Sequence, residues 1–418
     1  MPEFPYSRLR RWPDVEADNL QAYDATDLLL VERALSLDIP GSDTVVIGDE
    51  YGAITLALVE AGRHGIRVHQ DLATGRRALM RNAEELGLAV ADGRNGDQGT
   101  PVRRVTPQHA AGESDGLGFG GSFRPGELDA ELLTGAKLVL LQLPKSLAEL
   151  EEIADAVARW AAPDVVLVAG GRVKHMTLSQ NEVLGRSFAQ VQAQRAERKS
   201  RLIVASDALP VSAEPPFPVT AQHDGLTLVA HGGAFAGARL DIGTRVLLDA
   251  LALQPVQHEG GAVADGAAAP HVLDLGCGTG ALAVSYALAH PDARVTATDR
   301  SAAAVASARA TVAANGVADR VTVTHDDAAS ALPDASVDVV LLNPPFHLGA
   351  SIHTGAATRL FEAAARVLRP GGVLFTVYNS SLAYRPELTR LIGATAQVER
   401  TPKFTVTRSI RRAETAES

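Results

Sequence analysis

The stretch VVLLNPPFHLG, residues 339–349, combines residue types that can hold a planar amino group. An apolar run typical of a buried strand ends at Asn343. Pro344 and Pro345 cannot extend it, because neither has an N–H to donate to a neighbouring strand. The Asn343 side-chain oxygen and the Pro344 carbonyl offer two acceptors, and Phe346 offers a ring on which a base can stack. We predict that these four residues are catalytic and that the two oxygens hold the hydrogens of an amino group, turning the nitrogen lone pair towards an electrophile. A tight turn at the strand end is the alternative.

A glycine-rich turn lies upstream, in HVLDLGCGTGALAVSYALAH, residues 271–290, which reads as strand, turn and helix. Gly276, Gly278 and Gly280 permit a tight turn and a close approach of the backbone to a ligand. Asp274 lies inside the strand, where a carboxylate is costly unless it accepts backbone N–H groups or meets a cation. Such a turn also occurs in dinucleotide enzymes, so it does not define the ligand alone.

Two further predicted strands end in carboxylates. ARVTATD ends in Asp299, which is placed to accept hydrogen bonds from ribose hydroxyls. RVTVTHDDA ends in Asp326 and Asp327. Either of these could accept from the exocyclic amine of an adenine or cap the next helix, and we favour Asp327 for adenine. Ligands of open α/β sheets bind at the carboxyl ends of strands, so we expect all four strand ends to form one site.

The elements that must position these residues follow an α/β pattern, since strand-like apolar runs alternate with longer amphipathic runs along the chain. The two halves also resemble each other. VVIGDEYGAITLAL (45–58) parallels VLDLGCGTGALAV (272–284), and LVLLQLPKSL (138–147) parallels VVLLNPPFHL (339–348). We predict a duplication with a degenerate first copy, chance similarity of two doubly wound sheets being the alternative.

The set LDLGCGTG, TATD, DDA and NPPF resembles class I S-adenosylmethionine-dependent methyltransferases that modify an exocyclic or amide nitrogen. Together with LQAYDATDLLL (20–30), QLPKSLAELEEI (142–153) and VAGGRVKHMT (168–177), the two-copy layout resembles the bacterial ribosomal RNA guanine-N2 methyltransferases of large-subunit type G and small-subunit type C. The resemblance implies an α/β fold of two tandem Rossmann-like class I methyltransferase domains. It implies a degenerate, RNA-binding domain over 1–217, a catalytic domain over 218–412 and a disordered tail over 413–418.

The resemblance also implies a cofactor, S-adenosyl-L-methionine, and a partner, ribosomal RNA or a ribosomal subunit. In such enzymes the segment matching 226–251 closes over the cofactor, although AFAGARLD (234–241) departs from the usual Phe-Ser-Arg-x-x-Leu-Asp pattern. An ordinary helix capped by Asp241 is the alternative for the end of this segment. The first copy has Glu50 in place of Gly278, which would repel a methionine carboxylate, so we expect it to bind no cofactor. The cofactor-binding residues that we predict are Asp274, Gly276, Gly278, Gly280, Asp299, Asp326, Asp327, Asn343, Phe235 and Thr244.

Composition limits the alternatives. The chain has 418 residues and no run of 18 apolar residues, so we expect no membrane span. Cys277 is the only cysteine, which excludes an intrachain disulfide and fits a cytoplasmic location. The net charge of −10 argues mildly against a nucleic-acid partner, but residues 172–201 hold seven basic and two acidic side chains. We expect a monomer. Adenine N6 or a protein glutamine amide stays open as the methyl acceptor, and a non-catalytic RNA-binding assembly protein is a further alternative.

Overall fold

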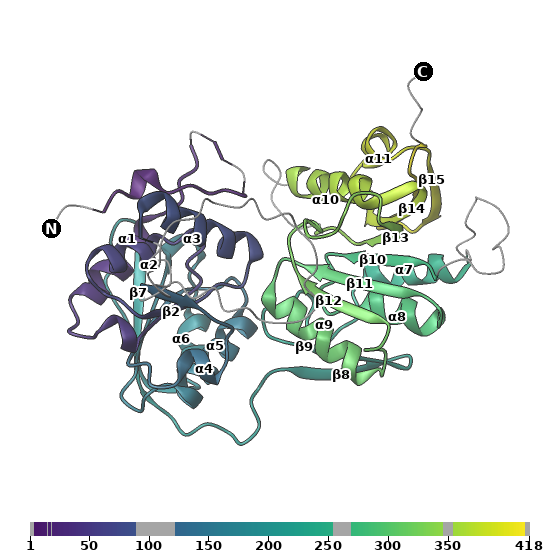
Figure 1. Cartoon of the computed structure of the whole chain (residues 1–418). Helices are drawn as coiled ribbons and strands as arrows, with labels where there is room; N and C mark the ends of the chain where they lie inside the picture. The colour runs from purple at the N-terminus through teal and green to yellow at the C-terminus, as the bar shows by residue number, and fades with distance from the viewer. Residues whose placement is uncertain are drawn as a thin grey trace, which may run out of the picture. The chain divides into compact units, whose positions relative to one another are not determined.

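The computed structural model describes residues 4–14, 16–17, 19–88, 122–253, 269–345 and 354–413. Helices and strands alternate along the chain and confirm the predicted α/β class (Figure 1). Among these residues, no helix is both long enough and apolar enough to cross a membrane.

The first half of the chain contains seven of the strands. Its elements are η1 (Tyr6–Arg8), α1 (Ala25–Leu35), η2 (Gly41–Asp43), β1 (Thr44–Ile47), α2 (Ala53–Glu60), β2 (Ile66–His69), α3 (Ala73–Leu86), β3 (Phe123–Pro125), α4 (Ala130–Leu133), β4 (Leu138–Gln142), α5 (Leu147–Trp160), β5 (Val166–Arg172), η3 (Val173–His175), α6 (Leu178–Leu184), β6 (Phe188–Ala193) and β7 (Ser200–Ala208).

The second half begins with a hairpin and then repeats the same series of elements. These are β8 (Val219–His223), β9 (Leu226–Ala230), α7 (Ile242–Leu253), β10 (His271–Leu275), α8 (Ala281–Ala289), β11 (Arg294–Asp299), α9 (Ala302–Ala314), β12 (Val321–His325), β13 (Val337–Leu342), α10 (Thr354–Val367), β14 (Leu368–Asn379), α11 (Arg385–Leu391), β15 (Thr395–Arg400) and β16 (Phe404–Ile410).

The two large sheets have the same strand order, which confirms the two tandem domains. The first sheet runs β3-β2-β1-β4-β5-β7-β6 and the second runs β12-β11-β10-β13-β14-β16-β15. In each, five neighbouring strands are parallel and the last two pair antiparallel. The four strand ends that the sequence assigns to one site therefore belong to the neighbouring strands β12, β11, β10 and β13.

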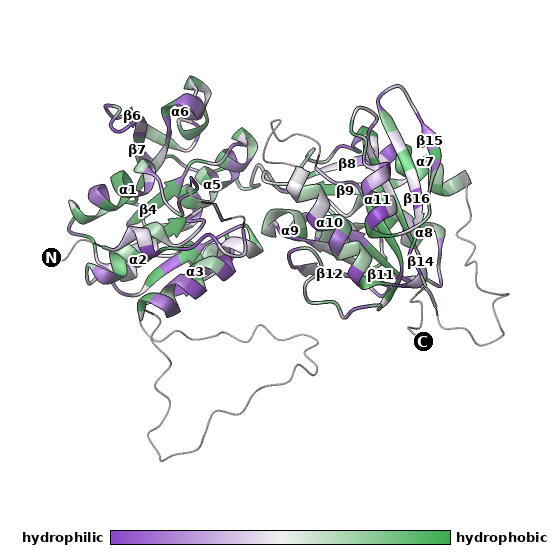
Figure 2. Ribbon diagram, turned by 90° about the horizontal axis from the view of Figure 1, so that it is seen from above, coloured by the Kyte–Doolittle hydropathy of each residue, from purple (hydrophilic) through white to green (hydrophobic). Residues whose placement is uncertain are grey.

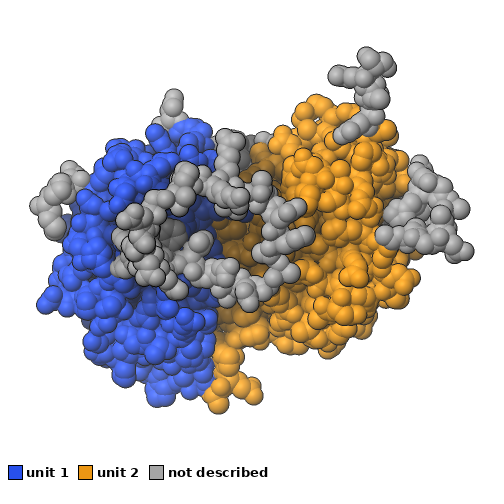
Figure 3. All heavy atoms as spheres, in the orientation of Figure 1, with its two compact units in different colours: residues 1–70, 74–145, 153–212 blue, residues 71–73, 146–152, 213–418 orange. Residues whose placement is uncertain are grey.

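Two compact units divide the chain between Ser212 and Ala213, a few residues before the predicted boundary (Figure 3). The second unit also includes the short segments Asp71–Ala73 and Ser146–Glu152. Residues 414–418 of the predicted disordered tail lie outside the described residues.

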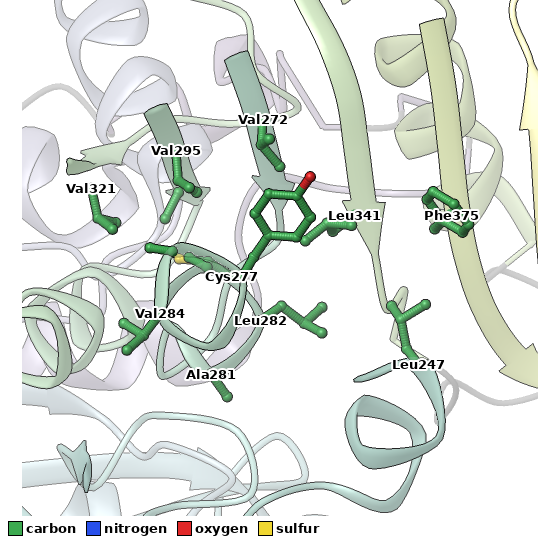
Figure 4. Close-up of a cluster of buried hydrophobic side chains, with 14 of the residues drawn as sticks. Leu247, Val272, Cys277, Ala281, Leu282, Val284, Val295, Val321, Leu341 and Phe375 are labelled. Carbon is green, nitrogen blue, oxygen red and sulfur yellow. The ribbon is translucent and has the colours of Figure 1, made fainter. Parts of the chain in front are cut away.

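The central strands are apolar on both faces, because helices cover both sides of a parallel sheet. All four residues of β1 are buried, and β13 buries every residue except Asp338. Figure 2 shows these sheets largely in the hydrophobic colour, while α3 carries hydrophilic residues along one side. In the second unit, Val272, Val295, Leu341 and Phe375 from four strands meet Leu282 of α8 in one buried cluster (Figure 4).

The β8–β9 hairpin attaches to α9 through side chains. Within the described part of the chain, β9 pairs only with β8, and its other edge faces α9. The backbone N–H groups of Thr227, Val229 and His231 donate to side chains of Asn315, Thr311 and Ser307 at 3.0, 3.0 and 2.9 Å. Each would otherwise be an unpaired donor at the edge of the strand. These bonds fix the start of the segment that leads into α7.

Candidate active site

Asp274 is fully buried near the end of β10, where the sequence predicted a costly carboxylate. One oxygen, Oδ2, accepts from the backbone N–H of Ala283 in the first turn of α8 at 2.9 Å. The other, Oδ1, has no hydrogen-bond partner among the described residues. Burial raises the pKa of Asp274 to about 7. A buried acceptor without a partner destabilises the free protein, so Oδ1 suits a ligand that brings a donor or a positive charge.

The glycine-rich turn is tied to the end of β11 by Asp299. Its Oδ2 accepts from Gly278 N–H and its Oδ1 accepts from Ser301 N–H, both at 2.9 Å. Burial raises the pKa of Asp299, while these two N–H donors lower it. Each carboxylate oxygen can accept a second hydrogen bond. Asp299 can therefore hold the turn and still accept from ribose hydroxyls, as the sequence predicts.

The three glycines have positive φ angles, and they serve two different purposes. A Cβ at Gly276 or Gly278 would meet no atom within 4 Å, so both border open space that a ligand can enter. A Cβ at Gly280 would lie 3.1 Å from that of Ala308, so Gly280 allows α8 to pack closely on α9. The turn thus fits a cofactor that lies against Gly276 and Gly278.

The two carboxylates after β12 are already engaged. Asp326 accepts from Ser330 Oγ at 2.5 Å and from Ala331 N–H at 2.8 Å, which closes the turn after the strand. Asp327 is buried and forms an ion pair with Arg359 of α10, a partner that the sequence did not indicate. The role of Asp327 towards an adenine amine stays a prediction.

Asn343 directly follows β13, and its amide group is held in one orientation. Its Nδ2 donates to Asp241 Oδ2 at 3.1 Å and to Thr244 Oγ1 at 2.9 Å. Asp241 precedes α7 and also accepts from the N–H groups of Gly243 and Thr244, so it is the predicted helix cap as well. Both acceptors hold the nitrogen, and the oxygen lies near the start of α7, 3.3 Å from where a Cβ at Gly243 would stand. That oxygen is buried and has no partner among the described residues.

The structure brings some of the predicted residues into direct contact. Asn343 and Thr244 are bonded to each other, and Asp299 is bonded to Gly278. Pro344, which follows Asn343, is buried, and Pro345 is exposed. Phe235, in the segment between β9 and α7, has 65% of its surface exposed, so its contact with a cofactor stays a prediction. Phe346 lies outside the described residues.

Sequence reasoning missed the link from Thr244 and Asp241 to Asn343. The first copy contains the same link, because Gln142 at the end of β4 donates to Asp27. Asp27 and Thr244 are each the third residue of a helix, α1 and α7. The signal was therefore present in the sequence as a polar residue near the start of the helix before each glycine turn.

The ligand-facing part of the first copy has changed. Asp49 is buried and accepts from the N–H groups of Ile54 and Thr55, much as Asp274 accepts from Ala283. Glu50, however, occupies the position of Gly278, and burial raises its pKa. At the matching position of the second copy, a Cβ at Gly278 would meet no atom within 4 Å. Loss of cofactor binding in the first copy stays a prediction.

The order of the second sheet, its glycine turn and its polar strand ends define a class I S-adenosylmethionine-dependent methyltransferase domain. The model of the methyltransferase small domain matches residues 225–408, and that of the RLMG N-terminal domain matches residues 3–101 and 126–209. A solved structure with the same fold is the T. thermophilus 16S rRNA N2 methyltransferase in complex with AdoMet and guanosine. It has a TM-score of 0.67 and 23% identity, over 93% of this chain and 92% of that one.

Curated relatives match nearly the whole chain. The ribosomal RNA large subunit methyltransferase G of Streptomyces coelicolor is 34% identical over 96% of this chain and 97% of that protein. That of Pseudomonas putida is 34% identical over the same shares. The chain belongs to the ribosomal RNA large subunit methyltransferase G family.

Proposed function

We propose that this protein transfers a methyl group from S-adenosyl-L-methionine to the exocyclic N2 of a guanine in ribosomal RNA, with the second unit as the catalytic domain. The observation that carries the proposal is the buried, unpartnered Oδ1 of Asn343. The relatives named above supply the substrate class, and the printed name of the T. thermophilus neighbour includes N2.

The cofactor fits the residues around the glycine turn. Gly276 and Gly278 border open space, Asp299 can accept from ribose hydroxyls, and Asp274 has one acceptor to spare. When bound, S-adenosyl-L-methionine supplies an electrophilic methyl group on a positively charged sulfur. A positively charged ligand beside them would in turn favour the ionised forms of Asp274 and Asp299.

Asn343 acts on the acceptor nitrogen. A guanine amino group is planar, because its lone pair is delocalised into the ring. Asn343 Oδ1 and the Pro344 carbonyl accept its two hydrogens, which favours a pyramidal nitrogen whose lone pair can reach the methyl carbon. Transfer would exchange the C–S bond of the bound cofactor for the new C–N bond, and the nitrogen would then release one proton to solvent. Positioning and electrostatic stabilisation account for the rate without a general base before transfer.

Substitution of Asn343 tests this assignment. Asn343→Ala removes the acceptor and should lower the transfer rate by roughly a hundred-fold or more, in line with the loss of one transition-state hydrogen bond. Binding of S-adenosyl-L-methionine, measured by calorimetry, should change little. Asn379→Ala is the matched control, because Asn379 ends the neighbouring strand β14 and its side chain bonds only to Ser381 in the described structure. Unchanged transfer by Asn343→Ala would contradict the proposed role.

A further inference from the structure

The turn between β6 and β7 has a backbone conformation that its side chains do not favour. Glu197 and Ser200 exchange both backbone hydrogen bonds, at 2.8 and 2.7 Å, and leave Arg198 and Lys199 as a two-residue loop. Their φ angles are +51° and +63°. Two consecutive positive φ values are the pattern of a type I′ hairpin turn, which strongly prefers Asn-Gly or Asp-Gly. Long side chains at both positions leave this turn strained.

The same chain uses the favoured pair in another hairpin. The turn between β8 and β9 consists of Asp224 and Gly225, with φ angles of +48° and +86°. His223 and Leu226 flank it as paired residues. Turn geometry alone therefore does not account for Arg198 and Lys199, and the two cations need another reason.

Further basic side chains surround this turn. Arg172 ends β5 and pairs with Ser200, and the N–H of Val173 donates to the Lys199 carbonyl at 3.0 Å, so the turn lies against the carboxyl end of β5. We call the basic tip the set Arg172, Lys174, Arg195, Arg198 and Lys199. Every member except Arg172 is exposed.

The cations of the basic tip are only partly neutralised by neighbouring carboxylates. Arg198 pairs with Glu32 at 2.8 Å and Arg172 approaches Asp24 at 3.8 Å, and both pairs are partly exposed to solvent. Glu197 is the further carboxylate within the turn. Among the described residues, ion pairs thus join two of the five cations to carboxylates, and exposed ion pairs of this kind are weak enough to exchange for another anion.

We propose that the basic tip binds the phosphate backbone of the RNA substrate. This proposal rests on the proposed function, which supplies a polyanionic partner. Arginine forks match phosphate oxygens in pairs, and a projecting two-residue turn can reach a groove or a single strand. Phosphate contacts of this kind position an RNA without reading its sequence. The strained turn persists because its cations contribute to binding.

Replacement of the turn by a favoured pair separates stability from binding. In the full-length protein, Arg198→Asn with Lys199→Gly should keep or raise the midpoint of thermal unfolding, because the new residues suit positive φ. The Kd for a ribosomal RNA fragment should rise by roughly ten-fold. The slope of log Kd against log salt concentration should fall by about 2, one for each lost phosphate contact. Affinity for S-adenosyl-L-methionine should stay unchanged.

The control removes the same charge elsewhere in the first unit. Arg124 and Lys137 are exposed and pair with Glu131 and Asp43, and Lys137 directly precedes β4, at the amino end of that strand. Arg124→Gln with Lys137→Gln should leave the salt slope unchanged.

If the turn variant is folded and both its salt slope and its Kd for RNA are unchanged, the proposal is wrong. The same result would be seen if the basic tip bound an acidic protein instead of RNA. If the turn variant loses thermal stability, Lys174→Gln tests the same charge outside the turn and should reduce the slope by about 1. RNA binding is measured without methyl transfer. Failure of the wild-type protein to methylate RNA would therefore count against the proposed function and not against the basic tip.

Discussion

Thr244→Val tests whether Thr244 orients Asn343 or contacts the cofactor. The change keeps the shape of the side chain and removes Oγ1, one of the two acceptors for Asn343 Nδ2, at 2.9 Å. Asp241 remains as the second acceptor at 3.1 Å. A neutral hydrogen bond contributes about 1 kcal/mol net, and each 1.36 kcal/mol of activation free energy is ten-fold in rate. We therefore expect kcat to fall by roughly five-fold.

The assay is transfer of labelled methyl groups to ribosomal RNA at saturating cofactor, together with calorimetry of S-adenosyl-L-methionine binding. Thr244→Ser keeps the hydroxyl and should restore kcat to within about two-fold of the wild-type value. Cofactor affinity should be the same in all three proteins. If Thr244→Val weakens cofactor binding and leaves kcat unchanged, Thr244 contacts the cofactor, as the family resemblance implies, and does not orient the amide.

Three further changes probe the site and its support. Asp274→Asn should flatten the pH dependence of the free energy of unfolding, measured by chemical denaturation between about pH 4 and pH 7. Burial raises the pKa of Asp274 to about 7, so the folded wild-type protein favours the protonated acid. The wild-type protein should therefore lose up to about 1.4 kcal/mol of stability per pH unit as the pH rises through this range. An equal slope in both proteins would exclude Asp274 as its source. Gly278→Ala should weaken cofactor binding by roughly ten-fold or more, as measured by calorimetry. The new Cβ would enter the open space beside the turn, and the φ of +53° at this position suits glycine. Equal affinity in the variant and the wild-type protein would place the cofactor elsewhere. Thr311→Val should lower the free energy of unfolding by about 1–3 kcal/mol, because the buried N–H of Val229 loses its partner, and an unchanged denaturation midpoint would refute that reasoning.

The sequence predicts the architecture well, because buried parallel strands consist of apolar runs and polar residues follow at their ends. The four predicted strands correspond to β10, β11, β12 and β13, except that β12 ends at His325, just before the predicted strand end at Asp326 and Asp327. The similarity of the two halves predicts two sheets, and their strand orders are identical.

The side-chain partners within the site were not predictable in the same way. The pairing of Arg359 with Asp327 joins α10 to the end of β12, and the bond from Asn343 to Thr244 joins β13 to α7. Both depend on how a helix packs over the sheet, which the spacing of residues along the chain does not specify. The sequence pattern does identify Asp241 as a cap, because capping is local.

The most direct test of guanine-N2 methylation identifies the modified nucleoside. Ribosomal particles and ribosomal RNA from a strain that lacks this protein would be incubated with the purified protein and S-adenosyl-L-methionine carrying a tritiated methyl group. Nuclease digestion and chromatography would then separate the labelled nucleosides. We predict that the label appears in N2-methylguanosine and that Asn343→Ala lowers its rate of incorporation by roughly a hundred-fold or more. Label in N6-methyladenosine, in protein, or in no product would contradict the account.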